Sequence, residues 1–365
     1  MTTDPQPSGN GAHHASPGEP PVIDAQQLLA PANASAPPPP EVASAIADAA
    51  STIGFFQLTN HGMDAAVLQR MTRAMHSFFD LDLETKLQAR RSETNAMGYA
   101  HDELTKQTLD LKEVFDVSRV PHPELPDTDP LNKTIEGFNL WPPGQDEFRA
   151  AVLAYYREVE RCSFQLLEAF CAGLGMERTA LHHLFEGQHT GFLRLNHYPL
   201  AHPLAQQAGK PQELMGVHHH TDAGFLTILV QDEVAGLEAL AADGTWHLVR
   251  PIDGALTINV GDLAQVLSND RFKAPLHRVR ASRERRRYSA PFFFNPRPDA
   301  DIAPLPQFVD DMHPPVYRPI NWGQFRSKRY EGDYADKGEE VQISHYRLDR
   351  IGSKEQRQQQ QQVAT

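Results

Sequence analysis

The chain has 365 residues, of which 40% are hydrophobic and 22% are charged, as in an ordinary soluble globular protein. Asp and Glu outnumber Lys and Arg by 47 to 34, and the net charge of −13 argues against a protein that binds nucleic acid through its phosphates. No apolar run approaches the roughly 18 residues that cross a bilayer, and the first residues form no secretory signal, so we expect a cytoplasmic protein with no membrane contact.

Both ends of the chain have the composition of disordered tails. Residues 1–20 are mostly Pro, Gly, Ser and His, and residues 351–365 are rich in Gln. Such segments bury too little apolar surface to offset the entropy lost on folding. Between the tails we expect a helix-rich N-terminal region over residues 21–140 and a catalytic β domain over residues 141–350.

The N-terminal region alternates short strands with helices. Strand-like residues lie at 22–24 and 54–60, and helical patterns lie at 41–50 and 64–79. The strongest helix signal covers about 148–174, where apolar residues recur every three or four positions and create one buried face.

After residue 190 the hydrophobic period changes from 3.6 to 2. Short strand-like runs follow, and they cover residues 191–198, 226–231, 245–249, 255–260, 276–281 and 287–294. Several short strands separated by turn signals are typical of a sandwich or barrel. We therefore expect a mixed α/β (α+β) fold, in which a helix-rich N-terminal half packs against an all-β half.

The segment around residue 220 carries the clearest metal-binding pattern. Side chains alternate along a strand, so His218, His220 and Asp222 are expected on one face and His219 on the other. A third ligand, His277, begins another strand-like run. Two histidines and one carboxylate leave positions open on a metal, which is the ligand set of non-haem Fe(II) oxygenases. An H-x-D pair alone also occurs by chance, in zinc sites and in structural hydrogen bonds.

A cationic side chain and a hydroxyl follow on the next strand-like run. Arg287 and Ser289 share a face by parity, and together they suit a carboxylate. We expect an antiparallel hairpin through the Arg-rich turn 283–286 to bring them near His277. One short dicarboxylate would then touch both the metal and this pair.

An upstream strand also has a polar face. Arg194, Asn196 and Tyr198 alternate with leucines over residues 191–198. Polar residues that face a barrel interior need partners, and a bound acid would provide them. The alternative is a solvated outer face.

These residues resemble the isopenicillin N synthase-like family of 2-oxoglutarate/Fe(II)-dependent dioxygenases. The resemblance rests on His220-Thr-Asp222, His277, Arg287-x-Ser289 and Asn196-His-Tyr-Pro199. It is supported by Gly54-Phe-Phe-Gln-Leu-Thr-Asn-His-Gly62, Gly98-Tyr99 and Asp110-Leu-Lys-Glu113, and it extends from about residue 20 to 350.

The resemblance implies a double-stranded β-helix (jelly-roll) core and an iron-dependent oxidoreductase. Fe(II) would be held by His220, Asp222 and His277. The cosubstrate 2-oxoglutarate would be converted with O2 to succinate and CO2 while a small organic molecule is hydroxylated or desaturated.

The resemblance also implies roles for residues around the metal. Arg287 and Ser289 would grip the C5 carboxylate of 2-oxoglutarate with help from Tyr198, and Asn196 would lie near its metal-binding end. For the second substrate, the candidate contacts are Tyr99 by resemblance and Phe293 and His218 by strand parity.

Three other functions remain open at this point. The first is a 2-oxoglutarate-independent iron oxidase of the same fold, like isopenicillin N synthase or aminocyclopropane carboxylate oxidase. The second is a non-catalytic, ligand-binding jelly-roll. The third is a zinc or manganese cupin, although such sites usually pair H-x-H with a downstream Glu, and the first Glu after His220 is Glu233.

Overall fold

The structure is a computed structural model of the whole chain. It describes residues 19–348 apart from 31–32, 34, 93–94, 106–107, 120–136, 138, 203, 205–214 and 336–340. For residues 331–335 it describes the backbone but not the side chains. Except for Glu19 and Pro20, the two expected tails therefore lie outside the described residues.

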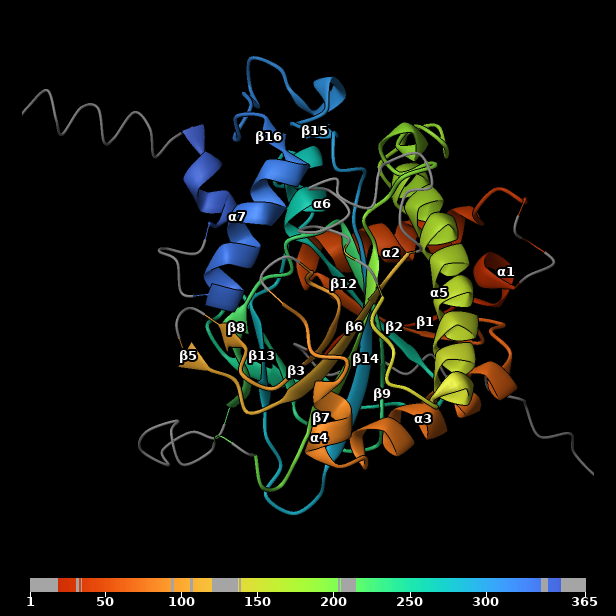
Figure 1. Cartoon of the computed structure of the whole chain (residues 1–365). Coiled ribbons are helices and arrows are strands. Elements are labelled where there is room, and N and C mark those ends of the chain that lie inside the picture. Colours follow the sequence, from red (N-terminus) through yellow and green to blue (C-terminus); the bar gives the residue numbers. More distant parts are fainter. Residues whose placement is uncertain are drawn as a thin grey trace, which may run out of the picture.

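An eight-stranded sheet, here called the main sheet, runs through the middle of the molecule (Figure 1). In spatial order its strands are β1 (Val22–Asp24), β2 (Phe55–Thr59), β12 (Leu256–Val260), β9 (Leu226–Gln231), β14 (Arg287–Phe294), β7 (Phe192–Tyr198), β6 (Glu113–Ser118) and β3 (Gly98–Ala100). β1 and β2 pair in parallel, and the other neighbours pair antiparallel. Four strands from the N-terminal region thus extend the sheet of the catalytic half, which the expectation of a helix-rich half packed against an all-β half did not include.

A second, four-stranded sheet faces the main sheet. Its strands are β11 (Trp246–Leu248), β10 (Leu237–Leu240), β13 (His277–Arg280) and β8 (Met215–His220). A small apolar cluster that includes Phe55, Leu229, Val217 and Val279 joins the two sheets. The expected jelly-roll is confirmed by this arrangement.

The expected hairpin between the strands that start at His277 and Arg287 is wrong. β13 pairs with β10 and β8, whereas β14 pairs with β7 and β9. The turn at 281–286 therefore crosses from one sheet to the other, and the two strands face each other across the sandwich.

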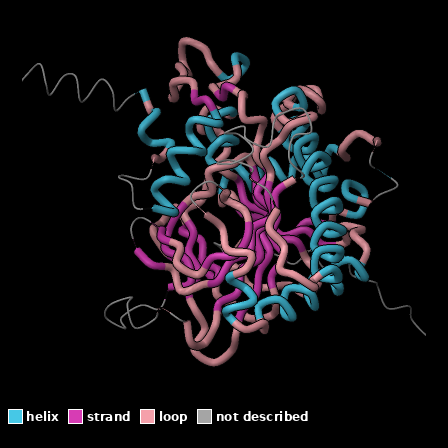
Figure 2. Tube along the Cα trace, viewed as in Figure 1, coloured by secondary structure: helices cyan, strands magenta, loops and turns pink. Residues whose placement is uncertain are grey.

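Helices cover the outer face of the main sheet (Figure 2). They are α2 (Pro40–Thr52), α3 (Ala65–Phe79) and α5 (Asp146–Gly173), and α5 matches the strongest predicted helix. Strand parity explains why the two faces differ. Tyr288, Ala290, Phe292 and Phe294 of β14 join the large core under the helices, and the alternate residues face the second sheet.

The remaining elements are short or lie at the edges. They are α1 (Gln26–Leu29), α4 (Leu83–Leu87), β4 (Leu104–Thr105), β5 (Thr108–Leu109), α6 (Asp262–Leu267), β15 (Asp301–Ile302), β16 (Ile320–Asn321), α7 (Trp322–Ala335) and the 3-10 helices η3 (His182–Leu184), η4 (Pro306–Phe308) and η5 (Ile343–Tyr346).

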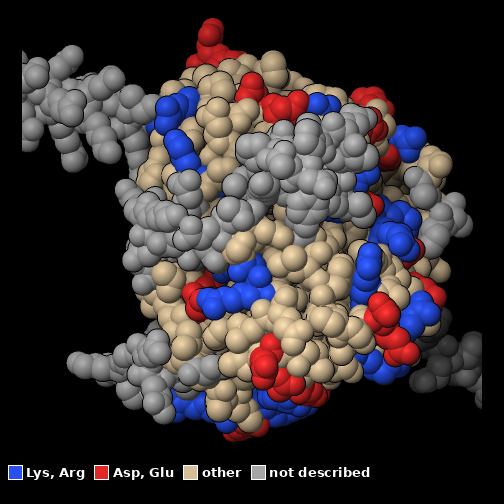
Figure 3. Space-filling model, in the orientation of Figure 1, with Lys and Arg blue, Asp and Glu red and all other residues tan. Residues whose placement is uncertain are grey.

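Charges of both signs are interspersed over the face of the molecule drawn in Figure 3. Within the described part of the chain, no helix combines the length and the apolar character that crossing a membrane requires.

Candidate active site

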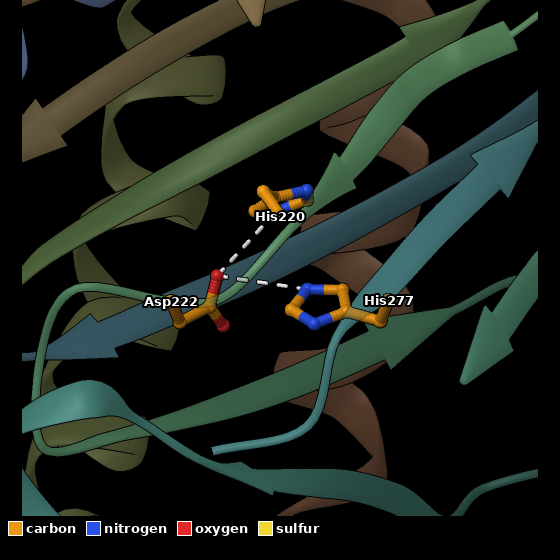
Figure 4. A group of neighbouring side chains, drawn as sticks. All are labelled: His220, Asp222 and His277. Atoms are coloured by element: carbon orange, nitrogen blue, oxygen red, sulfur yellow. Dashed lines mark ion pairs between the residues drawn. The ribbon is translucent and has the colours of Figure 1, made fainter. Parts of the chain in front are cut away.

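His220, Asp222 and His277 meet between the two sheets. His220 is the last residue of β8, and His277 lies opposite it as the first residue of β13. Asp222 lies in the turn after β8, so this turn, and not strand parity, brings its carboxylate to the histidines. One ligand atom from each residue lies within 4.8 Å of the others. Figure 4 shows the three side chains pointing toward one another.

Backbone carbonyls orient both imidazole rings. The Nδ1 of His220 lies 2.8 Å from the carbonyl oxygen of His218, and the Nδ1 of His277 lies 3.0 Å from that of Pro275. A carbonyl only accepts, so each Nδ1 carries a hydrogen, and Nε2 is the ring nitrogen left to bind a metal. Each Nε2 is 3.6 Å from Asp222 Oδ1.

The charge states of these residues also suit a metal. Burial, with nearby His220, lowers the pKa of His277 to about 4, so its ring is neutral at pH 7. Burial alone would raise the pKa of Asp222, but His277 and His220 outweigh it and hold that pKa well below its usual range. Metal ligands must be deprotonated in this way.

Two residues outside the predicted set orient the carboxylate. Asp222 Oδ2 accepts hydrogen bonds from Thr227 Oγ1 at 2.5 Å and Asn259 Nδ2 at 2.7 Å, which leaves Oδ1 toward the histidines. Both donors are buried. The signal that could have found them is a polar residue within a largely apolar strand, β9 for Thr227 and β12 for Asn259. Two imidazole nitrogens and an oriented carboxylate fit Fe(II).

A cavity between the sheets, here called the inner cavity, starts at the three ligands. Its lining residues are Phe55, Lys112, Arg194, Asn196, Tyr198, Val217, His220, Asp222, Thr227, Leu229, Leu237, Asn259, His277, Val279, Ser289, Pro291 and Phe293. Three of the four predicted cosubstrate residues are among them.

The fourth, Arg287, lies directly behind this lining. Its side chain is 1% exposed, and its guanidinium lies 4.9 Å from the ring centre of Tyr198. It donates to Ser289 Oγ at 3.3 Å. The register between β14 and β7 places Arg287 opposite Tyr198 and Ser289 opposite Asn196. The structure thus brings all four residues together.

A second cavity, here called the outer cavity, adjoins the first. It is lined by Glu103, Leu104, Thr105, Lys112, Phe192, Arg194, Val217, His220, Thr221, Asp222, Ala223, Gly224, Phe293, Asn295, Trp322, Arg326 and Arg329. Phe293, predicted as a substrate contact, lines both cavities.

The two other candidate substrate contacts lie outside the residues that line these cavities. Tyr99 is fully buried, and its hydroxyl donates to Glu113 in the core. The Nδ1 of His218 lies 2.8 Å from Asp110 Oδ1. Strand parity predicted His218 on the same face as His220, but β8 has a register shift between Val217 and His220 that breaks this parity, and it is Val217 that lines both cavities.

A jelly-roll with a two-histidine, one-carboxylate cluster beside a cavity backed by a buried arginine defines a class of protein, the non-haem iron oxygenases. Comparisons with known proteins support this class. Residues 20–144 match the family profile described as "non-haem dioxygenase in morphine synthesis N-terminal". Residues 189–296 match the profile of the 2OG-Fe(II) oxygenase superfamily.

Curated relatives and solved structures agree with these profiles. Feruloyl CoA ortho-hydroxylase 1 of Arabidopsis thaliana is 32% identical over 80% of this chain and 76% of its own length. Gibberellin 3-beta-dioxygenase 1 of the same plant is 31% identical over 78% and 76%. The structure of JOX2 with 2OG, Fe and JA superimposes with a TM-score of 0.69 at 28% identity and covers 84% of each chain. The dioxygenase for auxin oxidation in rice gives 0.66 at 26% identity, over 90% of this chain and 100% of that one.

The chain belongs to the 2OG-Fe(II) oxygenase superfamily, as the resemblance predicted. It is a 2-oxoglutarate-dependent dioxygenase that uses Fe(II), 2-oxoglutarate and O2 to oxidise a small organic molecule, with release of succinate and CO2. The relatives named here do not favour the non-catalytic jelly-roll or the cupin.

Proposed function

We propose that His220, Asp222 and His277 hold the catalytic Fe(II). The observation that carries this proposal is the orientation of the two imidazoles. Both rings donate Nδ1–H to a backbone carbonyl and turn Nε2 toward the same carboxylate oxygen. When bound, Fe(II) supplies the redox chemistry that couples decarboxylation of 2-oxoglutarate to oxidation of the second substrate.

The cosubstrate lies in the inner cavity in this proposal. The Arg287 guanidinium and the Ser289 hydroxyl bind the C5 carboxylate, and the Tyr198 ring packs against Arg287. Asn196, two residues along β7 from Tyr198, faces the metal-binding end; its buried Oδ1 accepts no hydrogen bond from the described residues. Burial strengthens this carboxylate site because little water competes with the guanidinium.

The second substrate occupies the outer cavity, with Phe293 at the boundary between the two cavities. Tyr99 and His218 are left out of this site because neither lines the inner or the outer cavity. The chain's own residues position both molecules beside the three ligands and exclude water from between them.

We further propose a cytoplasmic enzyme whose partners are small molecules, without nucleic acid or membrane. The acidic balance of the whole chain supports this proposal. The boundaries 21–140 and 141–350 remain a proposal for two regions of one folded unit.

Two neighbouring histidines provide the test of the metal site. His220→Ala should lose Fe(II) binding, whereas His219→Ala should keep it. The side chain of His219 is exposed, whereas that of His220 lines both cavities. Iron content and the absorption of the anaerobic Fe(II)–2-oxoglutarate complex measure this directly. Stoichiometric iron in His220→Ala would contradict the assignment.

A further inference from the structure

Lys112 follows β5 and is buried against both cavities. Its Nζ lies 2.8 Å from Glu103 Oε2 and 3.0 Å from Asp110 Oδ2. No other acceptor within the described residues lies within bonding distance of this ammonium. An ammonium has three hydrogens, so at least one remains for a ligand.

Arg194 of β7 also lines both cavities. It donates to Asp116 from Nε at 2.8 Å and Nη2 at 2.7 Å, and to Glu103 from Nη1 at 2.7 Å and Nη2 at 2.8 Å. Four of its five N–H groups are therefore used. The fifth, on Nη1, has no acceptor among the residues that the structure describes.

The outer cavity has no carboxylate left for a cationic ligand. Glu103 contacts Arg91, Lys112 and Arg194 at 2.7 to 2.8 Å. Burial would raise the pKa of Glu103, but these cations outweigh it and hold that pKa well below its usual range. The other carboxylate in the lining, Asp222, faces the histidines. The unused N–H groups in this cavity are those of the cations Lys112 and Arg194. They therefore favour binding of an anionic ligand.

The order of residues on the inward face of β7 shows where these donors lie relative to the two cavities. From the Arg287 end it presents Tyr198, Asn196, Arg194 and Phe192 in turn, and only Arg194 lines both cavities. Glu103, which holds the Lys112 ammonium, lines only the outer cavity. The donors therefore lie at the boundary between the cavities, on the side away from Arg287.

We propose that Lys112 and Arg194 bind a carboxylate of the second substrate, which is a small acid with a flat apolar body. This inference rests on the proposed function. The body packs against Phe192 and Phe293, whose rings stack with centroids 4.7 Å apart, while the carboxylate takes the unused N–H groups. The carbon that is oxidised lies close to the acid group, because His220 and Asp222 line the same boundary.

The test compares acids with their own amides. Phenylacetate, 3-phenylpropionate and cinnamate, each beside its primary amide, are titrated into the anaerobic Fe(II)–2-oxoglutarate enzyme, and the change in its absorption band reports binding. In the wild type the best acid should bind at least about tenfold more tightly than its amide, the effect of one hydrogen bond between charged groups.

Variants separate ligand binding from folding. Lys112→Met should lower the affinity for the acid by about ten- to a hundred-fold and the affinity for its amide by less than about threefold. The affinity for 2-oxoglutarate should be nearly unchanged. Lys86→Met is the matched control. Lys86 is also a buried lysine, 2.7 Å from a carboxylate oxygen of Glu113, but it lines neither cavity. It should keep the wild-type ratio of acid to amide affinity.

Three results would overturn the inference. If the wild-type enzyme shows the absorption band but binds no acid better than its amide, this inference is overturned and the proposed function is not. A Lys112→Met enzyme that loses 2-oxoglutarate affinity and keeps the acid preference assigns Lys112 to the cosubstrate instead. A wild type without the band overturns the proposed function together with this inference.

Discussion

Adjacent arginines at the start of β14 face opposite sides of the main sheet. Arg287 is buried beside Tyr198, whereas Arg286 is exposed and pairs with Asp80. Arg287→Ala should weaken 2-oxoglutarate by about ten- to a hundred-fold, because a hydrogen bond to a charged group contributes roughly 1.5–3 kcal/mol. Arg286→Ala should change the affinity for 2-oxoglutarate by less than about threefold, as expected for an exposed ion pair. Equal losses in an anaerobic 2-oxoglutarate titration would contradict the proposed cosubstrate site.

Asn259 acts on the metal only through Asp222. Its amide donates to Asp222 Oδ2, and Asn259→Leu removes that donor while keeping a similar volume. Because such partners orient a metal ligand, we expect Fe(II) affinity to fall by about ten- to a hundred-fold. Metal titration monitored by the 2-oxoglutarate absorption band measures this. Unchanged affinity would show that Thr227 alone holds the carboxylate.

Among the secondary-structure elements, Glu113 of β6 links its own strand to two segments of the N-terminal region and to β7 of the jelly-roll. It accepts hydrogen bonds from His197 of β7, Lys86 of α4 and Tyr99 of β3. Burial alone would raise the pKa of Glu113, but these hydrogen bonds outweigh it and lower that pKa to about 2, from an ordinary value of 4.5. A depressed carboxyl pKa stabilises the fold above the unfolded-state pKa, and this stability is lost as the pH falls from about 4.5 toward 2.

Glu113→Gln should therefore lower the free energy of unfolding at pH 7 and weaken its dependence on pH between about 4.5 and 2. Urea unfolding at a series of pH values measures both effects. Glu84→Gln on the exposed side of α4 is the control and should keep the wild-type dependence. The same dependence in Glu113→Gln as in the wild type would show that other carboxyls dominate acid unfolding.

At the scale of the whole molecule, the N-terminal region and the jelly-roll share one sheet and one large core. β6 pairs with β7, and Phe115 of β6 packs 4.7 Å from Phe78 and 5.2 Å from Phe148, measured between ring centres. Thermal unfolding should therefore be one cooperative transition with equal calorimetric and van't Hoff enthalpies. Phe115→Ala should lower the midpoint of that whole transition, since a buried Phe→Ala change costs about 3–5 kcal/mol. Two separate transitions would show that residues 21–140 and 141–350 fold independently.

Much of the chemistry of the site could be predicted from local sequence pattern. Side chains alternate along a regular strand whatever it pairs with, so the shared inward face of Arg287 and Ser289 could be predicted from local pattern alone. The same rule separated Arg287 from Arg286. The alternation is interrupted in β8, where a register shift lies between the inward-facing Val217 and His220. The α5 helix was predictable for a similar reason, because its apolar period depends only on its own residues.

The segments that meet in the fold could not be predicted in the same way. Sheet partners depend on contacts far apart in the chain, and local pattern carries no record of them. β13 and β14, which the sequence predicted to form a hairpin, therefore lie in different sheets. For the same reason Asn259 could not be assigned to Asp222, nor Lys112 to the boundary between the cavities, until the strands were in place. A register shift in β8 between Val217 and His220 also broke the parity that grouped His218 with His220, and His218 lines neither cavity.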